Sequence, residues 1–143
     1  MCKMIKRGLI TLDKSKYSLS KYKCESDDIW LDSACYDAQQ SLEFLMKGIL
    51  ASKGVVVGDE ENDIPKSQGH NIRHLLSRLT KEGFTFDKID DLTSLASTIT
   101  SWEEEGRYSP GVHVHEQTLH RVYKIFDSMY NAYICLLYTS PSP

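Results

Sequence analysis

The chain has 143 residues, of which 41% are hydrophobic and 26% charged, a composition typical of a globular protein with room for one domain and its own core. A formal net charge of -3 argues against broad, nonspecific nucleic-acid binding, because such binding depends on many Lys and Arg contacts with phosphate. Apolar runs are too short to cross a bilayer, and four cysteines without a CxxC pair fit a reducing compartment. We therefore expect a cytoplasmic protein with no membrane association, no disulfide framework and no zinc site.

The first half of the sequence predicts one weak helix and one strong helix. Residues 4–19 carry apolar side chains at irregular helical spacing. Residues 27–53 place apolar side chains at three- and four-residue intervals, which indicates a long amphipathic helix that Gly54 ends. The valines at 55–57 have no strand partner elsewhere in the sequence, so we expect a packed loop, followed by a polar loop over residues 59–69.

The second half predicts three more helices. They cover residues 70–82, 87–105 and 116–133, each with an apolar face at helical spacing. Phe84 and Phe86 fall between the first two and should form an apolar plug. Helices joined by short to medium loops, without strand periodicity, predict an all-α protein, a four- to five-helix up-and-down bundle.

The last nine residues behave differently from the rest. Residues 135–143 read Cys-Leu-Leu-Tyr-Thr-Ser-Pro-Ser-Pro, leave the helical pattern and resemble translated sequencing-adaptor read-through. We therefore expect a single domain over residues 1–134 and a non-native tail from 135. A genomic read with the same continuation would contradict this interpretation.

The segment between residues 102 and 113 holds the strongest candidate for chemistry. Arg107 carries a permanent forked charge that suits phosphate, and His113 can exchange protons near neutral pH. Across a Pro-Gly helix break, His113 could act as general acid or base on a phosphodiester while Arg107 stabilises charge on the phosphate. The structural alternative is that Arg107 pairs with a nearby glutamate or a helix-end carbonyl, and that His113 is an ordinary loop residue.

Metal binding is a weaker interpretation of the same region. His113, His115, Glu116 and His120 are all residue types that ligate metals. Only Glu116 and His120 have the four-residue spacing that brings two side chains together on a helix, and the usual pair of histidines at that spacing is missing. The sequence therefore predicts no metal site and no cofactor.

Other charged residues could extend such a site. Arg73 and Arg78 make one predicted helix basic, and Arg121 and Lys124 make the last one basic. If the two segments meet in space, they form a nucleic-acid-binding patch on an otherwise acidic protein.

Polar residues also interrupt the apolar stripe of the 27–53 helix. Glu43 has a lysine four residues later, so one interpretation is a surface ion pair worth about 0.3 kcal/mol. The other is that Gln39 and Glu43 support the site, because a buried Glu43 would need a partner such as Arg107, Arg73 or His70. For His70 the favoured interpretation is a packed histidine bonded to backbone at a helix start, and the alternative is that it supports the site near the basic helix.

Three motifs in order resemble the HEPN family of small helical domains. The first is QQSLEFLMK at residues 39–47, similar to the family's QQ-x-x-E-x-x-x-K helix. The second is HNIRHLL at 70–76, similar to its H-[D/N]-[L/I]-x-x-L helix start. The third is RYSP at 107–110, similar to its RYP segment with one inserted serine. The region of resemblance spans about residues 27–130.

The resemblance implies a bundle of four or five helices that often forms a homodimer and often accompanies a small nucleotidyltransferase. Some members are metal-independent ribonucleases that act as toxins. They use an Arg and a His with four to six residues between them, and two copies of this pair meet in a cleft at the dimer interface. Arg107 and His113 match that spacing, supported by Tyr108 and Glu43. Tyr108 itself departs from the Asn, Asp or His that commonly follows the Arg in active members.

Two functions remain open at this point. One is a metal-independent endoribonuclease of toxin–antitoxin or defence type. The other is a non-catalytic nucleotide- or RNA-binding and dimerisation module that partners a nucleotidyltransferase. A plain helical dimerisation protein, with structural polar residues, is the third and simplest interpretation.

Overall fold

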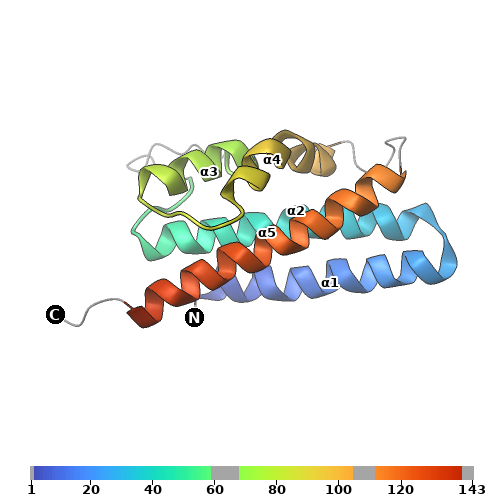
Figure 1. Cartoon of the computed structure of the whole chain (residues 1–143), viewed down its shortest axis with the longest axis horizontal. Coiled ribbons are helices and arrows are strands. Elements are labelled where there is room, and N and C mark those ends of the chain that lie inside the picture. The colour runs from blue at the N-terminus through green and yellow to red at the C-terminus, as the bar shows by residue number, and fades with distance from the viewer. Residues whose placement is uncertain (1, 59–67, 105–111, 140–143) are drawn as a thin grey trace.

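The computed structural model describes residues 2–58, 68–104 and 112–139. These ranges contain five α-helices and no β-strand: α1 (Lys3–Glu25), α2 (Asp28–Ser52), α3 (Ile72–Lys81), α4 (Ile89–Glu104) and α5 (Val112–Thr139). The predicted all-α helical bundle is confirmed (Figure 1).

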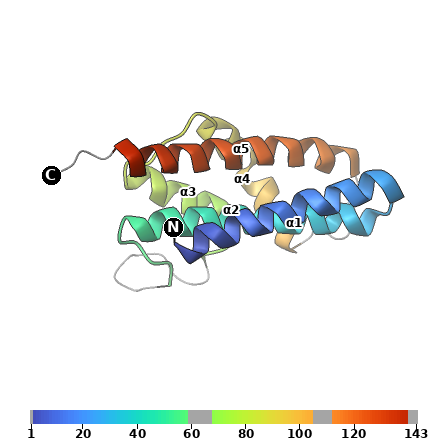
Figure 2. The same cartoon turned by 90° about the horizontal axis from the view of Figure 1, so that it is seen from below.

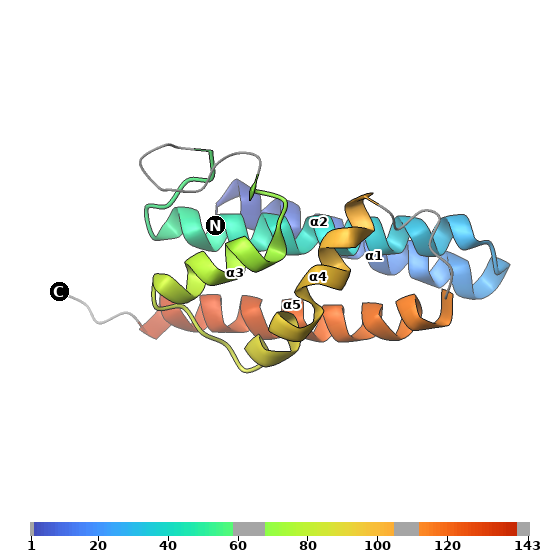
Figure 3. The same ribbon diagram turned by 90° about the horizontal axis from the view of Figure 1, so that it is seen from above.

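The three long helices form the body of the bundle. α1 and α2 make an antiparallel hairpin, and α5 runs back along them in the direction of α2 (Figures 1 and 2). The shorter helices α3 and α4 lie over α2 and α5 on the side opposite α1, and α4 crosses the long helices obliquely (Figure 3). No helix in these described ranges is both long enough and apolar enough to span a membrane.

Local sequence signals set where several helices begin and end. The Asp27 carboxylate accepts a hydrogen bond from the backbone N–H of Ile29 (3.0 Å) and so caps α2. The Asn71 side chain accepts from the N–H of His74 (3.2 Å) and caps α3 in the same way. Gly83 follows α3 with φ of 84°, a conformation that disfavours side chains with a Cβ.

The core lies where the apolar faces of all five helices meet. Phe84 and Phe86 plug it from the α3–α4 connection, as the sequence predicts. α1 approaches α2 closely at Gly48, where an added Cβ would lie 2.5 Å from Ile5 Cγ1, so α1 can pack directly on the α2 backbone. The largest fully buried side chains of the core include Trp102, Phe84, Phe126, Ile5, Leu31, Leu42, Leu45, Met46, Ile49 and Ile72.

A buried serine joins three helices inside this core. The Ser15 hydroxyl donates to the Ala34 carbonyl of α2 (2.6 Å) and shares a hydrogen bond with the Tyr123 hydroxyl of α5 (2.8 Å). Burial raises the pKa of Tyr123 to about 12, and burial likewise raises the pKa of the neighbouring Cys35 thiol to about 12. Both groups therefore stay protonated at neutral pH.

The first and last helices are longer than the sequence pattern predicts. α1 extends to Glu25, beyond the expected end near residue 19. α5 begins at Val112 and continues to Thr139, so the segment from Cys135 that we expected to leave the helical pattern is still helical. Its apolar side chains Leu136, Leu137 and Tyr138 are exposed, which is why periodicity does not detect it. The next helix-breaking residue is Pro141.

Candidate functional site

A buried carboxylate, Glu43, is the centre of the most unusual polar cluster in the described part of the chain. Glu43 lies on α2 among the apolar core residues and is only 2% exposed. A charged group so far from water needs close partners, because burial without them costs several kcal/mol. The surface ion pair that we considered for Glu43 and Lys47 is therefore wrong in its location, although the pair itself exists.

Donors surround both oxygens of this carboxylate. Oε1 accepts from Lys47 Nζ (3.2 Å) and from Nδ1–H of His70 (2.7 Å). Oε2 accepts from the side-chain amides of Gln39 and of Gln40, the latter at 3.2 Å. Gln40 also donates to Gln39 Oε1 (2.8 Å). We call these five residues the Glu43 cluster.

The Glu43 cluster joins two of the three motifs found in the sequence. Four members belong to the QQSLEFLMK segment on α2, and His70 belongs to the HNIRHLL segment at the start of α3. Of the two candidate partners within the described residues, His70 contacts Glu43, whereas Arg73 bonds to Ser97; Arg107 lies outside the described residues. His70 is thus more than a histidine bonded to backbone, because it ties the start of α3 to α2.

α4 contacts the segment that follows His70. The backbone N–H of Ile72, two residues after His70, donates to Thr100 Oγ1 in the last part of α4 (3.2 Å). Trp102, two residues further along α4, is buried in the core. α4 ends at Glu104, four residues after this contact.

The predicted catalytic pair is only partly within the described ranges. Arg107 and Tyr108 lie outside the described residues. His113 belongs to the first turn of α5, which begins at Val112. The roles proposed for these three residues therefore remain predictions.

The four predicted nucleic-acid-binding residues all have partners or a cavity beside them. Arg73 on α3 donates to Ser97 Oγ of α4 (3.0 Å). Arg121 on α5 pairs with Asp91 of α4 (3.7 Å), so both basic helices are linked to α4. Arg78 pairs with Glu82 on its own helix end (3.0 Å). Because Glu82 and Asp91 offset two of these charges, any positive patch that the four residues form is weaker than their number suggests.

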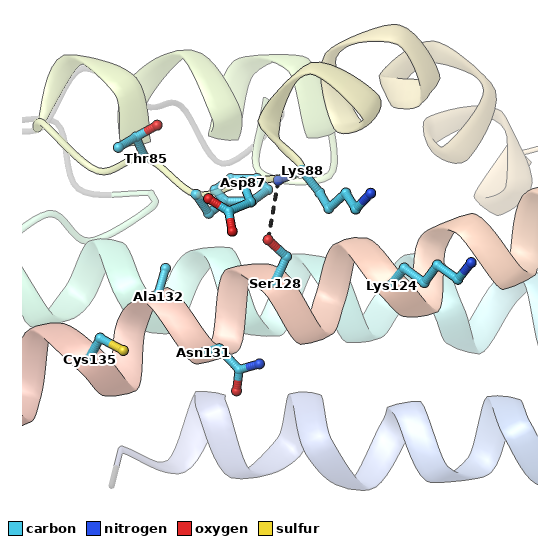
Figure 4. Close-up of a pocket in the computed structure, with 9 residues that line it drawn as sticks. Thr85, Asp87, Lys88, Lys124, Ser128, Asn131, Ala132 and Cys135 are labelled. Atoms are coloured by element: carbon cyan, nitrogen blue, oxygen red, sulfur yellow. Dashed lines mark hydrogen bonds between the residues drawn. The ribbon is translucent and has the colours of Figure 1, made fainter.

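Lys124 borders a cavity of about 530 Å³ between α5 and the α3–α4 connection. Figure 4 shows Lys124 and Lys88 extending toward the same end of this cavity, with Asp87 turned toward Ser128. The backbone N–H of Lys88 donates to Ser128 Oγ (3.2 Å), which holds the connection on α5 (Figure 4). Lys88 thus adds a second positive charge to this cavity, but the Asp87 carboxylate lines it as well.

Another cavity, of about 410 Å³, opens beside the Glu43 cluster. Lys47 and His70 line it together with Met4, Val56 and Val57. It therefore offers two nitrogen donors against an apolar wall, a combination that suits a small anionic ligand with an apolar part.

Sequence reasoning missed two parts of this arrangement. Gln40 was not expected to donate to the buried carboxylate, although its i−3 spacing from Glu43 is the signal that could have placed it. A groove between α1 and α5, lined by Lys16 and Lys23, was not expected either.

Comparisons with known proteins identify one family. A protein-family model described as HEPN domain matches residues 4–134. No curated protein and no solved structure matches the chain.

Proposed function

The chain belongs to the HEPN domain family, and from that premise we propose that it is a metal-independent endoribonuclease of toxin–antitoxin or defence type. The family is nucleotide-related and often of ribonuclease type. In this proposal Arg107 and His113 form the catalytic pair, with Tyr108 beside them and the Glu43 cluster supporting them. Domains of this family commonly dimerise, and we propose a homodimer here.

The observation that carries the proposal is the Glu43 cluster and its position. A polar network buried on α2 joins two of the motifs found in the sequence, and Thr100 of α4 contacts Ile72, two residues after His70 and four residues before α4 ends at Glu104. The third motif begins at Arg107, three residues later, and three residues of chain reach at most about 10 Å. This closeness supports a role for the cluster in positioning Arg107.

The proposed reaction is an internal transfer on the RNA backbone. His113 accepts the proton of a ribose 2'-hydroxyl, whose oxygen then bonds to the adjacent phosphorus. The bond from phosphorus to the 5'-oxygen of the next nucleotide breaks, and that oxygen takes up a proton. Arg107 stabilises the negative charge on the phosphate during this transfer. The products are a 2',3'-cyclic phosphate and a free 5'-hydroxyl.

The test is cleavage of mixed RNA by the purified chain in EDTA, beside Arg107→Ala and His113→Ala. Both substitutions should abolish cleavage, and the new ends should carry cyclic phosphate. His74→Ala on the exposed side of α3 is the matched histidine control, and Arg7→Ala on α1 is the arginine control; neither should reduce the rate. No cleavage by the parent, or cleavage that survives both substitutions, would refute the catalytic pair.

The cavity beside Lys47 and His70 favours a second function, a non-catalytic nucleotide-binding module that partners a nucleotidyltransferase. Its volume of about 410 Å³ is within the range of small-molecule sites. Titration calorimetry with ATP would test this function. Binding that Lys47→Met removes would support it, and absence of heat in the parent chain would exclude it.

A further inference from the structure

A groove runs between α1 and α5 on the side of the bundle away from α3. The two helices lie side by side there, as Figure 2 shows and as the Ser15–Tyr123 hydrogen bond requires. The groove has a volume of about 410 Å³, and its polar lining comes from Lys16, Ser20 and Lys23 of α1 and from His120 and Tyr123 of α5. We call it the α1–α5 groove.

The α1–α5 groove is basic on an acidic protein. Lys16 and Lys23 are seven residues apart, so they lie on the same side of α1 about 10.5 Å apart along its axis. None of the described residues that line the groove is acidic. The nearest ion partner is Glu116, which lies 3.5 Å from Lys23 Nζ, and such a half-exposed pair is weak enough for a stronger anion to displace.

Tyr123 holds one of the two lysines, and His120 offers a flat surface. Lys16 Nζ lies 5.5 Å from the centre of the Tyr123 ring, which fixes its charge over the groove. The exposed His120 ring meets Tyr123 edge-on, with ring centres 6.2 Å apart. A base can stack on an exposed imidazole, and a phosphate can approach the lysines, so this lining suits a nucleotide chain.

The two cavities described above suit an extended nucleic-acid strand less well. Asp87 shares the cavity beside Lys124, and its charge repels phosphate. The cavity beside Lys47 has mainly apolar walls, and its two nitrogen donors also bind Glu43, so it can hold a compact ligand but not a run of phosphates.

We propose that the α1–α5 groove binds the phosphate backbone of single-stranded RNA and holds it beside the first turn of α5. His120 lies two helical turns after His113 on the same helix, so a strand in the groove passes close to that turn. The choice of RNA as ligand rests on the proposed ribonuclease function. Lys16 and Lys23 are positioning residues here and take no part in bond breaking.

The experiment measures binding apart from cleavage. Fluorescence anisotropy of a 5'-labelled twelve-nucleotide oligouridylate gives Kd at several salt concentrations, with every chain carrying His113→Ala so that the RNA stays intact. Lys16→Ala with Lys23→Ala should lower the slope of log K against log salt by about 1.4, since each lost contact to a single strand contributes about 0.7. At 0.1 M salt this corresponds to a Kd roughly 25-fold higher.

Two further variants make the result specific. Lys3→Ala with Lys6→Ala removes the same charge from exposed sites at the other end of α1 and should change the slope little. Lys16→Arg with Lys23→Arg keeps the charge and should restore the slope. Circular dichroism checks that each variant is folded.

Each outcome decides the proposal. A slope and Kd equal to those of the Lys3 and Lys6 control, or absence of RNA binding by the parent, would overturn it. A lysine-dependent slope supports it even if the EDTA assay shows no cleavage, in which case the ribonuclease proposal alone fails. Cleavage without a lysine-dependent slope would support the ribonuclease proposal and refute RNA binding in the α1–α5 groove.

Discussion

Glu43→Gln is the sharpest test of how the polar cluster holds the bundle together. The substitution keeps the shape of the side chain but turns one carboxylate oxygen into an NH₂ group. Oε1 accepts from His70 and Lys47, and Oε2 accepts from Gln39 and Gln40. At the Oε1 position the new NH₂ faces Lys47, which can only donate, and at the Oε2 position it faces amides that must turn over to accept. At either position the negative charge opposite Lys47 is lost.

The expected loss follows from these contacts. A hydrogen bond to a charged group contributes about 1.5–3 kcal/mol, and an ion left buried without its partner costs more. Lys47 keeps only 17% of its side-chain surface exposed, so it can recover part of its hydration but not all. We therefore expect Glu43→Gln to lower the free energy of unfolding by about 3 kcal/mol, or the Tm by roughly 10 °C.

Urea unfolding followed by circular dichroism at 222 nm measures this change. Glu82→Gln is the matched control, because Glu82 pairs with Arg78 at a more exposed helix end and should lose less than about 1 kcal/mol. Combining Glu43→Gln with Lys47→Met should cost less than the sum of the two single changes, because both remove the same ion pair. Equal losses for Glu43→Gln and Glu82→Gln would refute the reasoning.

Three further predictions concern the core. Gly48→Ala should destabilise the chain by about 1–3 kcal/mol, because its Cβ would lie 2.5 Å from Ile5 Cγ1; greater stability in urea would contradict this crossing. The phenol of Tyr123 has its pKa raised from 10.0 to about 12 by burial, so above pH 10 it ionises in the unfolded chain first. Stability should therefore fall between pH 10 and 12, and Tyr123→Phe should flatten that fall in urea titrations. At pH 8, iodoacetamide should label the exposed Cys24 quickly and Cys35, with its pKa raised to about 12, only on unfolding, as peptide mass spectrometry would show.

The sequence predicted α2, α3 and α4 well because their buried faces are made of large apolar residues. The helical signal of α1 is weak because half of its buried face is small or polar, and its end was missed because Leu19 is its last buried residue. Gly8, Ser15 and Ser18 are buried beside Ile5, Leu12 and Leu19, and a hydrophobic pattern does not count them. Their burial depends on helices that pack against them, which periodicity within one segment cannot show.

The candidate site, too, could be predicted from the sequence only in part. The residue types around Glu43 could be found from sequence, but its partner could not be chosen among Arg107, Arg73 and His70. The choice follows from where the connection of residues 53–71 returns to α2, and loop length alone does not fix that point. The α1–α5 groove was out of reach for a similar reason, since Lys16 and His120 are brought together only by the packing of the first helix on the last.

The hydrogen bond between Ser15 and Tyr123 joins positions 108 residues apart and has a consequence for synthesis on the ribosome. The α1–α2 hairpin is local in the chain and can form as soon as both helices have emerged. In that hairpin the Ser15 hydroxyl already donates to the Ala34 carbonyl, so it has a hydrogen-bond partner before α5 has been synthesised. We expect apolar surface of α2 to stay exposed on the nascent chain until translation reaches Tyr123. At this stage the chain offers a chaperone the most apolar surface to bind.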